Sequence, residues 1–260
     1  MSQYMAAIWK CRYFWLSLVQ MDLRGRYRRS MLGLGWSLLH PIVLTMVLCV
    51  VFPRIFGDMD VRSYAPMVLV GLCFWSFIST TTLGGCQCLH HGERYIRQYP
   101  APMAIYPLRT VLGSSFHFGM ALVVVIVLRF LLIGFSGVAS FASLVPTFLL
   151  LFVVGWSLAL IAGFVTAYFP DVQHLSEVGL QILFYATPII YPADKIQGKL
   201  GALINLNPLT TFVELLREPL LHGHWPSVTQ FSFALRATYV IAAIAAMTAF
   251  RLQKKIIFQL

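Results

Sequence analysis

Long stretches of the chain carry almost no charge, and they alternate with short charged segments. A helix that crosses the hydrocarbon core of a bilayer needs about 20 mostly apolar residues. Six segments meet or approach that requirement: residues 35–52, 66–89, 109–129, 141–169, 172–190 and 231–252. The pattern therefore predicts an all-α membrane protein with six transmembrane helices.

The segments outside these spans predict two further features. Aromatic and charged residues mix along the first 33 residues, which indicates an amphipathic helix lying at the membrane interface. Residues 207–225 are too polar to span, and the prolines of this region indicate short helices that re-enter the outer leaflet between spans five and six. We expect one domain over 1–260, with 1–33 interfacial, 34–190 carrying spans one to five, 191–228 external, and 229–260 forming span six and a tail.

Composition supports the membrane assignment and indicates which kind of partner the basic residues meet. The chain is 59% hydrophobic and 11% charged, whereas soluble domains carry about 25% charged residues. Its net charge of +10 comes largely from basic residues that flank apolar runs. Anionic lipid head groups therefore explain the charge better than nucleic acid does, and we expect no nucleic-acid partner.

The basic residues also predict an orientation. In a six-span chain the N-terminal segment, the loop after span two and the C-terminus share one side, and all three carry Arg or Lys. The positive-inside rule makes that side cytoplasmic. Arg129, near the outer end of span three, is expected to reach the outer surface with its long side chain.

Several kinds of chemistry are missing from the sequence. None of the five lysines is followed by Ser or Thr, so the phosphate-binding motif G-x-x-x-x-G-K-[ST] does not occur. Neither His-Glu-x-x-His nor G-x-S-x-G is present, and we predict no catalytic residues, no metal site and no cofactor in this chain. Any ATP and magnesium would have to be bound by a partner subunit.

Three ordered motifs resemble one family. The segment MDLRGRYRRSMLGLGWSLLHPI (21–42) is similar to the entry segment of type-2 ABC exporter permeases, above all those that export O-antigen and related polysaccharides. Residues 169–192 resemble the family's turn between spans four and five and its fifth span. Residues 206–223 resemble its Asn-Pro segment and external re-entrant helix, which the family uses as a gate.

The resemblance implies partners and a location. Such a permease works as a homodimer with two copies of a cytoplasmic ABC ATPase, in the bacterial inner membrane, and it moves a lipid-linked glycan. The resemblance also implies that the loop after span two is the element on which the ATPase acts. We expect that coupling element to be a short helix ending before Pro100 and Pro102; its residues are Glu93, Arg94, Tyr95, Ile96, Arg97, Gln98 and Tyr99.

Two further sets of residues are candidates for contact with the substrate. Guanidinium groups match phosphate oxygens, so the arginines before span one could meet a lipid pyrophosphate, or else anchor the topology or contact the ATPase: Arg24, Arg26, Arg28 and Arg29. Sugar C–H faces stack on aromatic rings, which makes five residues candidates for the translocation channel: Phe74, Trp75, Phe184, Tyr185 and Tyr191. Thr80, Thr81 and Thr82 could add polar contacts.

Two alternatives remain open. A type-2 exporter of teichoic acid, capsule, lipid or a drug would show the same motifs. An ATP-independent channel or carrier would need no ATPase partner, so a stably bound ATPase would exclude it.

Overall fold

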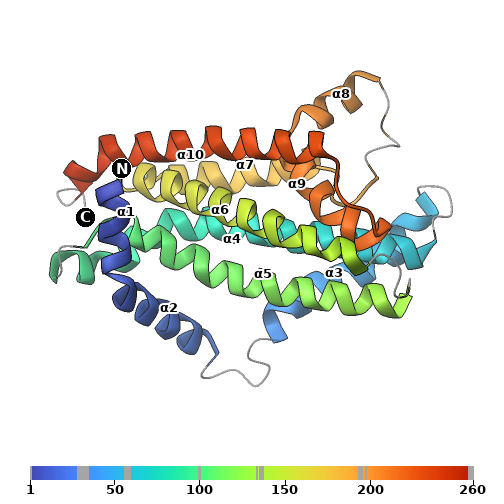
Figure 1. The fold of residues 1–260 in the computed structure, drawn as a ribbon, viewed down its shortest axis with the longest axis horizontal. Helices are drawn as coiled ribbons and strands as arrows, with labels where there is room; N and C mark the ends of the chain where they lie inside the picture. Colours follow the sequence, from blue (N-terminus) through green and yellow to red (C-terminus); the bar gives the residue numbers. More distant parts are fainter. Residues whose placement is uncertain are drawn as a thin grey trace.

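The computed structural model describes residues 2–27, 35–55, 60–98, 101–132, 134, 138–192, 196 and 198–256, and no strand occurs among them. A bundle of long helices dominates the molecule (Figure 1). In chain order the elements are α1 (Ser2–Lys10), α2 (Arg12–Tyr27), α3 (Gly35–Ile55), α4 (Val61–Gln98), α5 (Ile105–Leu132), η1 (Val138–Ser143), α6 (Leu144–Thr166), α7 (Val172–Ala186), α8 (Gly198–Leu206), α9 (Pro208–Arg217), η3 (Glu218–His222) and α10 (Val228–Ile256).

Four helices in the described part of the chain are long and apolar enough to cross a membrane. They cover Val61–Gln98, Ile105–Leu132, Val138–Thr166 and Val228–Gln253, and a shorter apolar helix lies at Leu38–Phe52. They correspond to the predicted spans two, three, four and six, and α3 corresponds to span one. The fifth predicted span appears as α7, whose 15 residues rise only about 22 Å at 1.5 Å each.

The long helix α4 lies at the centre of the bundle and contacts α3, α5, α6, α7 and α9. Small residues allow its close approach to α6, as in many membrane helix pairs. A Cβ added at Gly85 would lie 2.5 Å from the Cα of Ala159, and one at Gly163 would lie 2.7 Å from the carbonyl oxygen of Gly85. The main core fills the space between these helices with side chains such as Phe77, Phe118 and Val154.

The two ends of the bundle differ. At one end, called here the terminal end, α1, the last turns of α4 and the last turns of α10 lie together (Figure 1). The other end, called the distal end, holds α9 and η3 (Figure 1). The predicted interfacial helix therefore has the expected place before span one, but it consists of two helices, α1 and α2, that meet at Cys11.

The helix α1 is held on the terminal end by a few apolar side chains. Ile8 is buried in a second core cluster, which also contains Ile96 of α4 and Met103. The backbone N–H of Ala104 donates a hydrogen bond to the Tyr4 hydroxyl over 3.3 Å. Burial raises the pKa of Tyr4 above its ordinary value, and this hydrogen bond opposes the shift, so Tyr4 stays neutral at physiological pH.

At the distal end two arginines are buried, and one corrects a prediction. Arg129 does not reach the outer surface: it is 1% exposed. Its Nε donates to the carbonyl of Leu220 over 3.1 Å, and its Nη1 donates to the carbonyl of Gly134. Reaching water is unnecessary because η3 supplies a backbone acceptor inside the protein and Phe141 lies under the guanidinium.

The second buried arginine, Arg217, joins three segments. It lies at the end of α9, is 3% exposed, and pairs with Glu214 over 3.1 Å. Its Nη2 donates to the carbonyl of Ile189, which follows α7, over 3.0 Å and to that of Met67 in α4 over 3.4 Å. Arg129 and Arg217 thus fasten the short helices of residues 208–222 onto the bundle.

Candidate functional site

The residues predicted to form a separate coupling helix are the last turns of α4. Glu93 to Gln98 continue that helix without a break, and Tyr99 lies outside the described residues. Residues 93–98 are thus helical as predicted, but they end a longer helix instead of forming an element of their own, and their coupling role stays a prediction. The buried face of α4 simply continues, because Gly92 packs under the ring of Tyr106 and Ile96 is 8% exposed.

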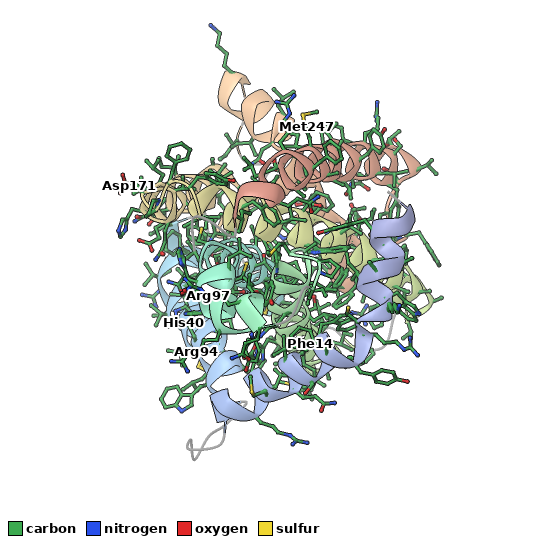
Figure 2. All side chains as sticks on the ribbon, turned by 90° about the vertical axis from the view of Figure 1, so that its left-hand side faces the viewer. Phe14, His40, Arg94, Arg97, Asp171 and Met247 are labelled. Carbon is green, nitrogen blue, oxygen red and sulfur yellow. The ribbon has the colours of Figure 1, made fainter. Side chains whose placement is uncertain are left out.

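The exposed side of these turns carries charge. Arg97 forms an ion pair with Glu93 one turn earlier, with 2.7 Å between nitrogen and oxygen. Arg94 is exposed. Figure 2 looks onto the terminal end, where Arg94, Arg97 and Phe14 of α2 gather. A polar protein surface could dock here, with side chains available from both α4 and α2.

The helix α2 is fastened to this end of the bundle by two contacts. The rings of Phe14 and Tyr95 meet edge to face, with centroids 6.1 Å apart. Asp22 accepts hydrogen bonds from two guanidinium nitrogens of Arg109 in α5, which makes a bidentate ion pair. The helix α2 is therefore in direct contact with both α4 and α5.

Only part of the predicted arginine cluster can be placed. Arg24 is exposed on α2, one turn from Tyr27, where that helix ends. The backbone of Arg26 belongs to α2, but its side chain lies outside the described residues, as do Arg28 and Arg29 entirely. The pyrophosphate contact therefore stays a prediction.

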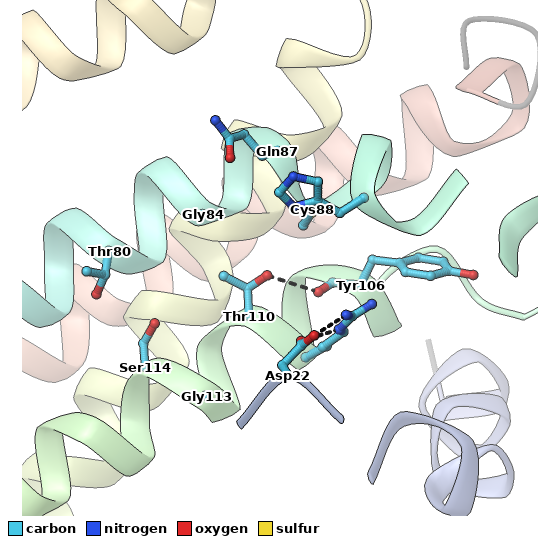
Figure 3. Close-up of a pocket in the computed structure, with 11 residues that line it drawn as sticks. Asp22, Thr80, Gly84, Gln87, Cys88, Tyr106, Thr110, Gly113 and Ser114 are labelled. Carbon is cyan, nitrogen blue, oxygen red and sulfur yellow. Dashed lines mark hydrogen bonds and ion pairs between the residues drawn. The ribbon is translucent and has the colours of Figure 1, made fainter. Parts of the chain in front are cut away.

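A groove between α4 and α5 opens beside the Asp22–Arg109 ion pair. Its cavity measures about 410 Å³, and its lining includes Thr80 and Gln87 of α4 and Thr110 and Ser114 of α5. Figure 3 shows Thr80 and Ser114 pointing toward one another across it, with the ion pair at one end. Most of its lining side chains can form hydrogen bonds.

The groove continues deeper into the bundle. A second cavity of about 230 Å³ shares Thr80 and Ser114 with the first. Trp36 and His40 of α3, Ser76 of α4 and His117 of α5 add to its lining. Its inner wall is apolar, formed by Phe77, Phe118 and Ala121 among others. The two cavities together form the α4–α5 groove.

The aromatic residues predicted to line the channel differ in their burial and contacts. Phe74 is fully buried in the main core, so its contact with a substrate stays a prediction that this conformation does not support. The indole of Trp75 is half-buried against Phe184, with centroids 5.5 Å apart. Tyr185 is 64% exposed, and the hydroxyl of Tyr191 donates to its backbone carbonyl over 2.9 Å.

These two tyrosines line another hollow, near the end of α7. Its volume is about 670 Å³, and its other lining residues, mostly apolar, include Leu183, Ile204 and Leu206. Asn207 borders it, caps α9 by accepting from the N–H of Leu209, and donates to the hydroxyl of Thr187. The tyrosines therefore face open space together, although their contact with a substrate stays a prediction.

Sequence reasoning did not single out the α4–α5 groove, although a signal for it exists. Ser76, Thr80, Gln87, His91 and Arg94 are separated by four, seven, four and three residues, which places them on one face of a helix. All five are exposed. Of the three threonines proposed as polar contacts, Thr80 belongs to this face, Thr82 is half-buried, and Thr81 is buried and donates to the carbonyl of Phe77.

Comparison with known proteins shows which family this chain resembles. A family model described as ABC-2 type transporter matches residues 13–221. An O-antigen export system permease protein RfbA of Klebsiella pneumoniae is 25% identical over 203 residues, which is 78% of each chain. A protein of the same name from Myxococcus xanthus is 24% identical and covers 95% of each chain.

A polysialic acid transport protein KpsM of Escherichia coli is also similar, at 24% identity over 78% of this chain and 79% of its own. The family match extends from α2 to η3. Its range includes the first two motifs recognised in the sequence and most of the third. The chain therefore belongs to the family of ABC-2 type transporters.

Proposed function

We propose that this chain is the membrane permease of an ATP-driven exporter that moves a lipid-linked polysaccharide across the bacterial inner membrane. The observation that carries the proposal is the family match over residues 13–221, together with relatives named for O-antigen and polysialic acid export. The chain has no nucleotide-binding motif, so its energy must come from a separate ATPase.

In this proposal the bundle crosses the membrane six times, with α3 and α7 as spans one and five. The terminal end, with its basic residues, faces the cytoplasm. The helices α8 and α9 and the turn η3 then lie on the outer side as re-entrant elements. Exposed apolar side chains on α1 and α2, including Trp9 and Tyr13, suit the head-group region of the inner leaflet.

Two copies of the chain would form the working permease. Among the described residues of α7 only Leu180 is classed as buried, while Leu175, Val178 and Ile182 are exposed at 58–68%. A short helix so poorly covered by its own chain suits contact with a second copy. Two ATPase subunits would then dock at the terminal end, against the last turns of α4 and against α2.

The test is to purify the chain with the ATPase encoded beside it and to place the complex in lipid nanodiscs. We expect polyprenyl-pyrophosphate-linked oligosaccharides to raise the ATPase rate severalfold, and a drug panel or teichoic-acid precursors to leave it unchanged. Failure to retain any ATPase through purification would instead favour an ATP-independent channel. Stimulation by the other substrates alone would favour another kind of type-2 exporter.

A further inference from the structure

The polar face of α4 extends well into the part of the helix that a membrane would cover. Thr80 and Ser76 lie near the middle of the apolar stretch 66–89, and both are exposed. Polar groups facing hydrocarbon are costly, and those found at this depth line cavities or face other protein. The hydroxyl of Thr80 donates to the carbonyl of Ser76 in its own helix, but this polar face of α4 still suits water, a ligand or a partner better than hydrocarbon.

The structure offers a cavity in front of that face. The α4–α5 groove begins at Asp22 and His91 near the terminal end, passes between Thr80 and Ser114, and ends at an apolar wall. Its two adjoining cavities, of about 410 and 230 Å³, share Thr80 and Ser114, and the first falls in the range of roughly 300–1,000 Å³ typical of small-molecule sites. One end of the groove thus lies near the predicted cytoplasmic surface.

The charge of the lining restricts the ligand. Among the described lining residues the formal charges are those of Asp22 and Arg109, and these two groups pair with each other. The other polar lining groups are hydroxyl, amide and imidazole side chains, and they include Ser76, Thr80, Tyr106, Thr110, Ser114, Gln87, His40, His91 and His117. Such a lining offers donors and acceptors without a net charge, so it favours a neutral, hydroxyl-rich ligand over a phosphate.

An aromatic surface completes the recess. Trp36 of α3 lines the deeper cavity and is 58% exposed. An indole face can stack on the C–H face of a sugar ring while neighbouring hydroxyls and imidazoles exchange hydrogen bonds with its hydroxyls. The distance along α4 from His91 to Ser76 is about 22 Å at 1.5 Å per residue, which leaves room for more than one sugar ring.

We propose that the α4–α5 groove binds the first sugar units of the lipid-linked glycan, next to its pyrophosphate, before translocation. This inference rests on the proposed function and names the part of the substrate that the recess takes. Pyrophosphate would stay outside the groove, where Arg24 is exposed on α2 two residues after Asp22. The ion pair of Asp22 and Arg109 at the groove mouth has no net charge, so it does not draw the pyrophosphate into the groove.

Cysteine labelling in the purified complex with its ATPase tests the proposal. Ser114→Cys exchanges one oxygen for sulfur at a position that lines both cavities, so it should fold normally. Phe116→Cys is the matched control, because Phe116 lies at nearly the same depth on α5 but is 45% exposed on another face. We expect a charged, membrane-impermeant methanethiosulfonate to modify Ser114→Cys at least tenfold faster than Phe116→Cys, after subtraction of the unsubstituted chain.

Protection then identifies the occupant. A polyprenyl-pyrophosphate-linked oligosaccharide should slow the modification of Ser114→Cys at least fivefold, whereas polyprenyl pyrophosphate without sugar should not. Equal protection by both probes would mean that lipid or pyrophosphate fills the groove, which overturns the inference. No protection by an oligosaccharide that still stimulates the ATPase would also overturn it, while leaving the proposed function intact. An oligosaccharide that neither stimulates nor protects would count against the proposed function itself.

A second variant probes transport directly. Thr80→Trp would fill the groove opposite Ser114, and we expect export of the glycan to fall at least tenfold while the ATPase still co-purifies. Thr248→Trp places the same bulk on α10, away from the groove. Normal export by Thr80→Trp would contradict the proposal, because an indole between α4 and α5 leaves no space for a sugar ring there.

Discussion

At the scale of single residues, Arg217 is a buried side chain that joins several segments of the distal end. It is buried, pairs with Glu214, and donates to backbone carbonyls in two other segments. Removal of one partner of a buried ion pair costs roughly 3–5 kcal/mol. We therefore expect Arg217→Ala to lower the melting temperature of the purified protein by about 10 °C, measured by intrinsic fluorescence. The control Arg236→Ala, at an exposed position, should leave it unchanged.

Gly71 lies so close to Arg217 that a side chain at this position would crowd the guanidinium. A Cβ at Gly71 would lie 3.0 Å from the Cγ2 of Ile189 and 3.3 Å from Nη2 of Arg217. Gly71→Ala should therefore destabilise the wild type by displacing these groups. In the Arg217→Ala background the same change should cost less, since one of the two crowded groups is gone. Full additivity of the two substitutions would contradict this account.

At the scale of helices, the ion pair between Asp22 and Arg109 is the polar tie between α2 and the bundle. Asp22 is partly exposed, so the pair adds only about 0–1 kcal/mol to stability. The ion pair is important because it fixes the position of α2 against α5. Asp22→Arg should reduce glycan-stimulated ATPase activity at least fivefold by repelling Arg109, with little change in melting temperature. The double variant Asp22→Arg/Arg109→Asp should restore activity to within about twofold. If activity stays low, the ATPase activity depends on the residue type at each position and not on the ion pair between them.

Close packing of α4 on α6 makes a second prediction about an element. A side chain at Gly85 would collide with backbone atoms of Ala159, which cannot move without shifting α6. Overpacking of a core typically costs about 1–3 kcal/mol. Gly85→Leu should lower the melting temperature by roughly 5 °C or more, whereas Gly119→Leu, with open space around its Cβ position, should not. Equal melting temperatures would indicate that the two helices are less tightly packed than described.

The helices themselves could largely be read from the sequence, because apolar runs and their charged ends mark membrane spans directly. Contacts between the helices could not be predicted from the sequence. Arg129 was expected at the surface because sequence alone does not show that η3 offers its Leu220 carbonyl nearby. The end of α4 was expected to be a separate helix because nothing in the sequence reveals that Tyr106 covers Gly92.

The groove illustrates the same limit at the candidate site. Its polar face on α4 is visible as a spacing pattern, but its other wall comes from α5 and α3, and only the folded chain brings Ser114 and Trp36 to Thr80. Phe74 was chosen as an aromatic beside Trp75, yet consecutive helical residues point about 100° apart. One of them had to turn inward, and the structure shows that it is Phe74.

At the scale of the whole molecule, the exposed apolar face of α7 can contact either lipid or a second copy of the chain. A bulky substitution on this face distinguishes the two arrangements. A bulky apolar side chain is tolerated where a helix faces lipid, but it clashes where a second copy packs closely. We predict that Ile182→Trp reduces the recovery of dimers carrying two different tags at least fivefold, while Val127→Trp on α5 leaves it unchanged; both residues are exposed, at 64% and 51%. Because both variants add the same indole to an apolar surface, a difference between them isolates contact between copies. Equal recovery would place α7 against lipid, and the second copy would then have to bind through another helix.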